Sequence, residues 1–374
     1  MALLLAVLCA AGCVSPGVQV RARFGFTPYT VSAGGRTPFG VAVADFNGDD
    51  RADLAVSDVA SGAIALLLQS AEGTFSPAAQ WRAGKVPRGL VASDLNADGH
   101  MDLVVATVRS GVVVFLGDGH GGAVRTAYPA GLAPFNVAVA DLDNDGSLDI
   151  VVANESNMPA LQGRGTVSVL FGDGHGTFPR TVTLEADSYP ADVKVADLNG
   201  DGRLDIVVVN WKSADVSLFL GQGDGTFAAA RAVPYGGMPS YSLAVADLNH
   251  DGTPDIAVGD VQGLVRVLSN DGAAGFTAGK PLTAGAGLRT VITADLNGDG
   301  LADLATANTQ ADTVTVLLAL PAGGFGPPSH IAVGTRPRAV SAADLNGDGT
   351  LDLVVTNGGS DNLSLLMNHS VASS

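Results

Sequence analysis

A nine-residue, aspartate-rich stretch returns along the chain and constrains the fold more than any other feature. It reads DFNGDDRAD in its first copy and DLNGDGRLD in its fourth, and successive copies begin 49, 47, 56, 50, 48 and 49 residues apart. The seven copies begin at Asp45, Asp94, Asp141, Asp197, Asp247, Asp295 and Asp344. A repeat of this length is typical of one four-stranded blade of a β-propeller.

Short apolar segments around each stretch predict the strands of such a blade. In the fourth unit ADVKVAD leads into the stretch, LDIVVVN follows it, DVSLFLG comes next, and an outer strand lies near ARAVPYG. The 49 glycines and 18 prolines of the chain favour short strands and tight turns over helices. A phenylalanine after the hairpin glycines is predicted to fill the space between blades, at Phe75, Phe178, Phe227, Phe276 and Phe325.

The two ends of the repeat array complement each other. The last unit stops after its third strand, NLSLLMN at 362–368, while an extra stretch at 24–35, FGFTPYTVSAGG, matches the outer strand of the other units. Pairing the two would complete the last blade and remove both exposed sheet edges. We therefore predict an all-β fold, a seven-bladed β-propeller over residues 24–370 closed by its N-terminal strand, with a tail at 371–374.

The opening residues, 1–13, read MALLLAVLCAAGC and hold both cysteines of the chain, Cys9 and Cys13. Disulfides therefore cannot hold the body of the protein together. The segment is apolar, too short to span a bilayer, and lacks the usual positive n-region of a signal peptide. AAGC resembles the lipobox of bacterial lipoproteins, so lipidation at Cys13, an ordinary signal peptide and a buried N-terminal segment are the alternatives. We expect export, to the cell envelope or by secretion, with 14–23 as a linker and no transmembrane span.

The repeated stretches have the ligand order of a calcium loop. Calcium takes about six to eight hard oxygens, which short loops supply from side chains at positions 1, 3 and 5, a backbone carbonyl at position 7 and a later carboxylate. Position 6 is glycine in six copies, where a sharp turn is needed, and Asp50 replaces it in the first copy. We predict up to seven calcium ions, one per blade. Turns that hold no ion are the alternative.

The predicted ligands follow from these positions. Position 1 is the first aspartate of each copy given above. Position 3 is Asn47, Asn96, Asp143, Asn199, Asn249, Asn297 or Asn346. Position 5 is Asp49, Asp98, Asp145, Asp201, Asp251, Asp299 or Asp348. Position 7, which would offer its carbonyl, is Arg51, His100, Ser147, Arg203, Thr253, Leu301 or Thr350. Position 9 is Asp53, Asp102, Asp149, Asp205, Asp255, Asp303 or Asp352.

The negative charge of the chain is concentrated in these stretches. They contain 23 of the 37 acidic residues, and the net charge of the whole chain is −17. The other 14 acidic residues compare with 20 basic residues in the whole chain, two of which, Arg51 and Arg203, lie in the stretches, so bound divalent cations would neutralise most of the excess. No basic stripe with interleaved aromatic residues is present, and we expect no nucleic-acid partner.

With its ligand order and its repeat length, the chain resembles the FG-GAP and VCBS repeat proteins, bacterial relatives of the integrin α-subunit propeller. The resemblance covers residues 24–368 and implies a calcium loop between the first two strands of each blade. The family includes adhesins, lectin-like proteins and domains attached to enzymes, so membership does not choose a ligand.

The loops opposite the calcium loops are the predicted binding surface. The residues six positions before each first aspartate, which should lie at the channel mouth, are Phe39, Arg88, Phe135, Ala191, Tyr241, Arg289 and Arg338. Aromatic and arginine side chains suit sugars or anionic ligands, and packing on neighbouring loops is the alternative. The longest unit places its surplus in the turn at 154–165, and such an insertion is typical of a working face, with Trp211 expected beside it. A surface insertion without function is the alternative.

These features predict a monomeric, calcium-stabilised binding or scaffold protein that recognises a glycan or protein partner at the cell surface. We expect no enzyme. The six histidines are scattered, and no Gly-x-Ser-x-Gly elbow, phosphate loop or His-Glu-x-x-His helix occurs. A propeller enzyme acting on polysaccharide, as a lyase or hydrolase, and a purely structural envelope component are the alternatives.

Overall fold

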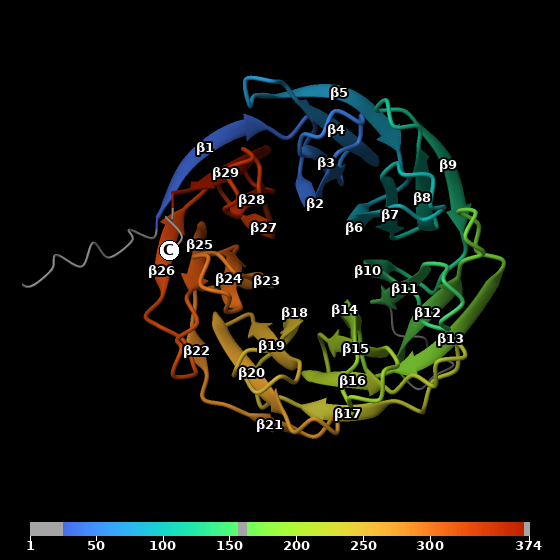
Figure 1. Cartoon of the computed structure of the whole chain (residues 1–374), viewed down its shortest axis with the longest axis vertical. Helices are drawn as coiled ribbons and strands as arrows, with labels where there is room; N and C mark the ends of the chain where they lie inside the picture. Colours follow the sequence, from blue (N-terminus) through green and yellow to red (C-terminus); the bar gives the residue numbers. More distant parts are fainter. Residues whose placement is uncertain (1–24, 156–162, 370–374) are drawn as a thin grey trace, which may run out of the picture.

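A computed structural model describes residues 25–155 and 163–369, whose strands form seven antiparallel sheets around a central channel (Figure 1). Each sheet is one blade, and in six of the seven the strands follow one another in chain order from the channel outward. The predicted seven-bladed β-propeller is confirmed. Within the described ranges no helix is long and apolar enough to cross a membrane.

The strands are as follows. The first blade contains β2 (Pro38–Ala44), β3 (Asp53–Asp58), β4 (Ala63–Gln69) and β5 (Phe75–Arg82). The second contains β6 (Pro87–Ser93), β7 (Asp102–Thr107), β8 (Gly111–Gly117) and β9 (Ala123–Tyr128). The third contains β10 (Pro134–Ala140), β11 (Asp149–Asn154), β12 (Gly165–Phe171) and β13 (Arg180–Ala186). The fourth contains β14 (Pro190–Ala196), β15 (Asp205–Asn210), β16 (Asp215–Phe219) and β17 (Arg231–Pro234).

The remaining blades repeat the plan. The fifth contains β18 (Ser240–Ala246), β19 (Asp255–Asp260), β20 (Leu264–Asn270), β21 (Phe276–Ala278) and β22 (Leu282–Thr283). The sixth contains β23 (Leu288–Ala294), β24 (Asp303–Asn308), β25 (Thr313–Leu317) and β26 (Ser329–Ala332). The seventh contains β27 (Pro337–Ala343), β28 (Asp352–Asn357), β29 (Asn362–Asn368) and β1 (Phe26–Ser32).

The ring is closed by β1, the first strand of the described chain. It pairs antiparallel with β29 in an unbroken register from Phe26 opposite Asn368 to Ser32 opposite Asn362. Figure 1 shows this seam, where the blue start of the chain lies beside its red end. The backbone N–H of His369 also donates to the carbonyl of Gly25, 3.0 Å away. The predicted closure is therefore confirmed.

The fifth blade departs from the predicted plan in its outer strand. That strand is split into β21 and β22, both of which pair with β20. Pro281 lies in the interruption, where it has no backbone N–H to donate to the ladder. The split is confined to the outer edge and leaves the inner three strands of the blade regular.

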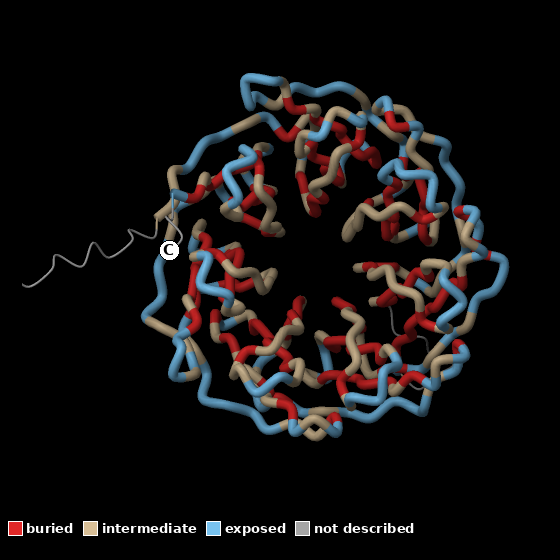
Figure 2. The backbone as a smooth tube through the Cα atoms, in the orientation of Figure 1, coloured by how far each residue is buried: buried red, intermediate tan, exposed pale blue. Residues whose placement is uncertain are grey.

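The core lies between the blades rather than inside each of them. Seven clusters of buried apolar side chains occur, one for each pair of neighbouring blades. In one of them Ile64 and Leu66 of the first blade pack with Leu103 and Phe115 of the second. The five phenylalanines predicted to fill these spaces belong to the clusters or pack against them. Figure 2 shows the consequence: buried backbone in the middle of the blades, between partly exposed strands at the channel and an exposed outer rim.

The innermost strand of every blade carries an irregularity near its start. The register with the second strand shifts after the first residue of the innermost strand. The shift lies between Pro134 and Asn136 in the third blade and between Leu288 and Thr290 in the sixth. A β-bulge re-aims the side chain of the extra residue and strengthens the local twist. Each bulge contains the residue that the sequence placed at the channel mouth.

Candidate functional site

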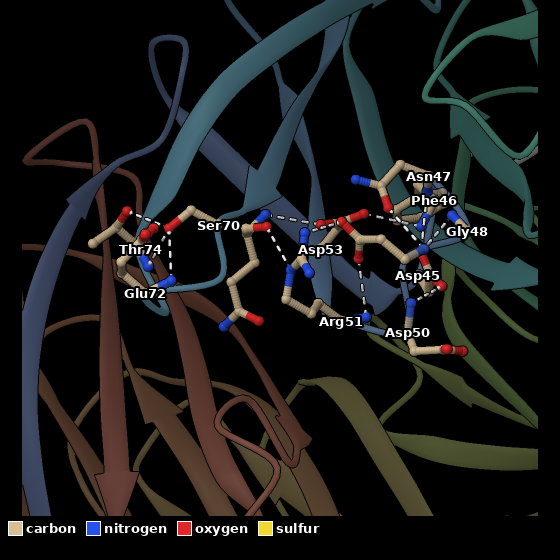
Figure 3. Close-up of polar contacts among 12 residues, drawn as sticks. Asp45, Phe46, Asn47, Gly48, Asp50, Arg51, Asp53, Ser70, Glu72 and Thr74 are labelled. Atoms are coloured by element: carbon tan, nitrogen blue, oxygen red, sulfur yellow. Dashed lines mark hydrogen bonds and ion pairs between the residues drawn. The ribbon is translucent and has the colours of Figure 1, made fainter.

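The aspartate loops (residues 45–53, 94–102, 141–149, 197–205, 247–255, 295–303 and 344–352) connect the first and second strands of each blade. In the first loop the Asp45 carboxylate accepts backbone N–H groups from Asn47, Gly48, Asp49 and Asp50 at 2.7–3.2 Å (Figure 3). Burial opposes ionisation, but these four hydrogen bonds prevail and lower the pKa of Asp45. The loop therefore winds around its first carboxylate.

Two positions of each loop require left-handed backbone. Position 6 has a positive φ in all seven loops, and Asp50 adopts it with φ of 63°. Position 4 does so as well, although only four loops place glycine there. Ala97, Asn144 and His250 take this conformation without being glycine. The glycine at position 6 predicts left-handed backbone from the sequence. Position 4 also needs positive φ, but its residue varies among the loops, so the sequence does not indicate it.

The aspartate at position 9 is completely buried in every loop. One of its oxygens accepts the backbone N–H of position 2, and the other accepts the N–H of the last residue of the third strand or of a residue one or two positions after it. In the fourth blade these donors are Leu198 at 3.0 Å and Gly221 at 2.8 Å from Asp205. The predicted ligand is thus also a structural link between the loop and the end of the third strand.

Burial dominates the protonation of these position-9 groups. It raises the pKa of Asp102, Asp149 and Asp303 to about 6, although two backbone hydrogen bonds to each carboxylate oppose the shift. The neighbouring carboxylates at positions 1 and 5 add repulsion in the same direction as burial for Asp102 and Asp303. A divalent cation at the loop would remove this repulsion.

The third loop is where carboxylates converge most closely. Oxygen atoms of Asp141, Asp143 and Asp149 all lie within 4.8 Å of one another. The Oδ1 atoms of Asp141 and Asp143 are buried and have no hydrogen-bond partner among the described residues. Arg180 neutralises part of the charge through an ion pair of 2.8 Å with Asp143 Oδ2. Two buried oxygens without donors fit a hard divalent cation such as calcium.

In five other loops the residue at position 3, where the third loop has Asp143, is an asparagine whose side chain donates a hydrogen bond within the loop. Their position-3 asparagine donates its amide N–H to the position-5 aspartate at 2.8–2.9 Å. The asparagines are Asn96, Asn199, Asn249, Asn297 and Asn346. Asp143 cannot make this bond because an ionised carboxylate has no donor. The backbone N–H of position 7 donates to the position-5 carboxylate in all seven loops. Arg51 and Arg203 add side-chain ion pairs to that carboxylate.

The opposite face carries the residues of the bulges. Phe39, Phe135 and Tyr241 form a line of ring contacts, with centroids 5.7 Å apart for Phe39–Phe135 and 5.9 Å for Phe135–Tyr241. Arg289 covers this line, its guanidinium carbon 3.6 Å from the Tyr241 centroid. Arg88 lies over Phe135 at 4.6 Å.

Six of the seven bulge residues contact one another at the channel mouth. Together with Trp211, we call them the mouth cluster: Phe39, Arg88, Phe135, Trp211, Tyr241, Arg289 and Arg338. Ala191, the seventh bulge residue, is instead buried in the apolar cluster between the fourth and fifth blades. The mouth cluster borders a cavity of about 490 Å³ that continues into the channel.

The mouth cluster has more positive than negative charge. Arg88 pairs with Glu155, whereas Arg289 and Arg338 have no ion pair among the described residues. Burial lowers the pKa of Arg289, and the nearby Arg338 and Arg88 add to the effect. Stacking on aromatic faces compensates part of the lost hydration. Both unpaired guanidiniums therefore remain able to pair with an anionic group.

Trp211 extends the cluster toward the longest unit. Its ring stacks on Tyr241 at 5.6 Å and meets Tyr189 at 6.0 Å. Its Nε1 is buried without a hydrogen-bond acceptor among the described residues. Most of the predicted insertion at 154–165 lies outside those residues. Sequence reasoning missed Tyr189 and Lys212, whose ammonium lies 5.4 Å from the Tyr189 ring, although the Tyr-Pro and Trp-Lys pairs mark the two adjoining turns.

Comparison of the sequence with known families gives a match to the FG-GAP-like repeat over residues 94–152, 159–208, 197–258, 247–306 and 295–355. The chain belongs to the FG-GAP-like repeat family. Four of the five matched segments contain two FG-GAP aspartate loops each, and the segment 159–208 contains one. No curated protein sequence matches the chain.

Solved structures that share the propeller fold of this FG-GAP protein have low sequence identity to it. BBS1N in complex with ARL6DN is 14% identical, with a TM-score of 0.65 over 93% of this chain and 98% of that one. Virginiamycin B lyase from Staphylococcus aureus, an inactive variant with quinupristin, is 12% identical, with a TM-score of 0.61 over 92% and 99%. A protein of unknown function from Desulfotomaculum acetoxidans is 12% identical, with a TM-score of 0.58 over 82% and 93%. Binding proteins and enzymes thus both use this fold.

Proposed function

We propose that the protein is an exported, calcium-stabilised recognition protein that binds a glycan or a protein partner at the mouth cluster. The observation that carries the proposal is the stack of aromatic rings under Arg289 and Arg338, whose guanidiniums have no acidic partner among residues 25–155 and 163–369. Aromatic faces pack on sugar rings, and guanidiniums bind carboxylate or sulfate groups in a bidentate manner. A partner-binding role also agrees with the BBS1N structure, which is a complex with ARL6DN.

A glycan array tests this function, with wild-type protein compared with Arg338→Gln. Arg338 lies 5.3 Å from the Phe39 centroid and is partly exposed, so its replacement removes a charge without opening the core. We expect glycan binding that falls about tenfold or more in the variant. Lys280→Gln, an exposed lysine on the outer edge of the fifth blade, is the matched control and should bind as wild type. Equal binding by all three proteins would place recognition elsewhere.

The polysaccharides retained on the array should also be assayed for cleavage. A recognition protein releases its ligand unchanged, whereas a propeller lyase or hydrolase would shorten it. Turnover of any bound polysaccharide, lost in Arg338→Gln, would replace the proposed function with an enzymatic one.

The calcium part of the proposal is supported most directly by the third loop. Asp141 and Asp143 hold buried oxygens without donors there, and calcium would complete their coordination. The other six loops have the same ligand order with weaker convergence, and we propose that they bind with lower affinity. Millimolar calcium outside the cell suits such sites, which agrees with export.

A reciprocal pair of substitutions tests the third loop. Asp143→Asn gives it the asparagine of its neighbours, and Asn297→Asp gives the sixth loop the extra carboxylate. In chelator we expect Asp143→Asn to raise the melting temperature, because it removes repulsion and supplies a donor, and Asn297→Asp to lower it. In millimolar calcium the advantage of Asp143→Asn should shrink or reverse. Identical shifts with and without calcium would show that the third loop holds no ion.

A further inference from the structure

A groove lies between the first and second blades, on the face opposite the aspartate loops. It has a volume of about 900 Å³ and is formed by the turn after β3, the connection from β5 to β6 and the turn after β7. Its lining residues are Val59, Ala60, Ser61, Gly62, Arg82, Gly84, Lys85, Val86, Arg109, Ser110 and Arg125. None of them belongs to the mouth cluster.

The charge of this groove is opposite to that of the chain. Four of its lining residues are cationic and none is acidic, in a chain of net charge −17. Arg82, Lys85 and Arg109 are exposed, and their side chains make no ion pair or hydrogen bond within residues 25–155 and 163–369. Cations held together without counter-charges repel one another, and an anionic ligand would relieve that repulsion.

The walls of the groove are held by fixed contacts. The backbone N–H groups of Ala83 and Gly84 donate to the Gly62 carbonyl at 3.0 and 2.9 Å. Arg125 Nε donates to the Arg82 carbonyl at 2.9 Å, and its Nη2 donates to that of Ala83 at 3.2 Å. These bonds use two of the five N–H donors of Arg125 and leave the others for a ligand. The backbone of the groove and the Arg125 guanidinium are therefore held in place before any ligand binds.

Glycine is required on the floor of the groove. Gly84 has φ of 130°, and a Cβ there would lie 2.4 Å from Ser110 Oγ. Any side chain at this position would both strain the backbone and fill the groove.

We propose that this groove is a second ligand site, separate from the mouth cluster, that binds a carboxylated or sulfated oligosaccharide. The Ser61 and Ser110 hydroxyls offer hydrogen bonds to sugar hydroxyls between the cations, and the volume lies in the range of small-molecule sites. No aromatic side chain of the described residues lines the groove, so among them a nucleic acid would find no surface on which to stack its bases.

Isothermal titration with trigalacturonate, at fixed millimolar calcium and low ionic strength, tests the proposal. The double variant Lys85→Gln/Arg109→Gln removes two exposed cations and should weaken binding about tenfold at an unchanged melting temperature. Lys280→Gln is the charge-matched control and should stay within about twofold of wild type. Neutral maltotriose should not bind in the groove. Sulfated maltotriose, run beside trigalacturonate, shows which anionic group is preferred.

Three results would overturn the inference. The first is unchanged trigalacturonate affinity in the double variant. The second is equal loss in Lys280→Gln, which would indicate a general charge effect. The third is tighter binding of a single-stranded oligonucleotide with the same sensitivity to Lys85→Gln/Arg109→Gln. Arg338→Gln separates this site from the proposed function, because it should impair the mouth cluster and leave the groove unaffected.

Discussion

At the residue scale, the aspartate loops depend on backbone conformations that only some of their side chains suit. Positions 4 and 6 both adopt positive φ, and position 4 has glycine in some loops and larger residues in others. A non-glycine residue costs about 1–2 kcal/mol in this region, partly offset by the greater entropy that glycine loses on folding. At position 4 the chain therefore offers glycine and non-glycine residues in the same left-handed conformation, and these can be compared directly.

Ala97→Gly should stabilise the protein by about 0.5 kcal/mol, because Ala97 has φ of 56° at position 4. Gly200→Ala is the reverse change at the same position of the fourth loop, where a Cβ would meet nothing closer than 3.8 Å. It should destabilise by about 1 kcal/mol through backbone strain alone. Denaturant unfolding measures both. Shifts of the same sign would contradict the argument.

The position-9 carboxylates are predicted to matter more for stability than the exposed ones. Asp205→Asn should lower the free energy of unfolding by about 2–3 kcal/mol. The new amide N–H₂ would face one of the two backbone N–H groups that now donate to the carboxylate, and that group would lose its acceptor. Asp201→Asn, in the exposed part of the same loop, should cost much less. Unfolding in chelator isolates this effect from any ion. Equal losses would mean that the buried hydrogen bonds contribute little.

At the element scale, the strand order, the ring closure and the loop positions could be predicted from the sequence, because each follows from the repeat of the aspartate-rich stretch and its flanking strands. The bulges had no such signal. They exist only in the pairing of the first strand with the second, yet they bring Phe39, Phe135 and Arg289 to one point. The list of mouth residues was predictable by position, whereas their stacking depends on distances across the channel. The backbone role of Asp205 was likewise hidden, since a buried acceptor and a metal ligand look alike in sequence.

Removal of residues 24–35 should open the ring at its seam. Without β1 the backbone groups of β29 lose their partner, and amide exchange should accelerate in 362–368 before the middle blades respond. The truncated protein should also self-associate through the bare edge. Thr30→Asp, an exposed residue of β1, is the control and should retain protection. A monomeric truncated protein with β29 still protected would contradict the role of β1 as the closing strand.

At the scale of the whole molecule, stability is shared among seven interfaces between blades, and the aspartate loops lie at the ends of the same strands. Ions bound only by the folded state would add about 0.4 kcal/mol each when calcium equals its Kd, or about 3 kcal/mol for seven independent sites. Chelation should therefore lower the melting temperature. An unchanged melting curve, with magnesium as a comparison, would show that the loops need no ion.

The raised pKa values predict an unusual pH dependence in chelator. Because burial raises the pKa of Asp102, Asp149 and Asp303 to about 6 in the folded state, that state binds protons which the unfolded chain does not. These groups stabilise the fold fully below about pH 4, the unfolded pKa, and the contribution is lost as pH rises through about 6. The calcium-free protein should melt higher at about pH 5 than at about pH 7.5. Calorimetry that finds the opposite order would contradict the assignment, and calcium should diminish the difference by competing with protons.

The seam has a mechanical consequence. The β1 strand begins at Phe26, opposite Asn368, whose N–H donates to Asp352 of the seventh aspartate loop, and it runs toward the opposite face, where the mouth cluster lies. A force applied through the chain that precedes Gly25, against a ligand held at the mouth cluster, would pull β1 along its own axis. All seven residue pairs with β29 would then be sheared together rather than peeled one at a time. The ring is therefore closed by the strand orientation that best resists tension between an upstream attachment and a bound partner.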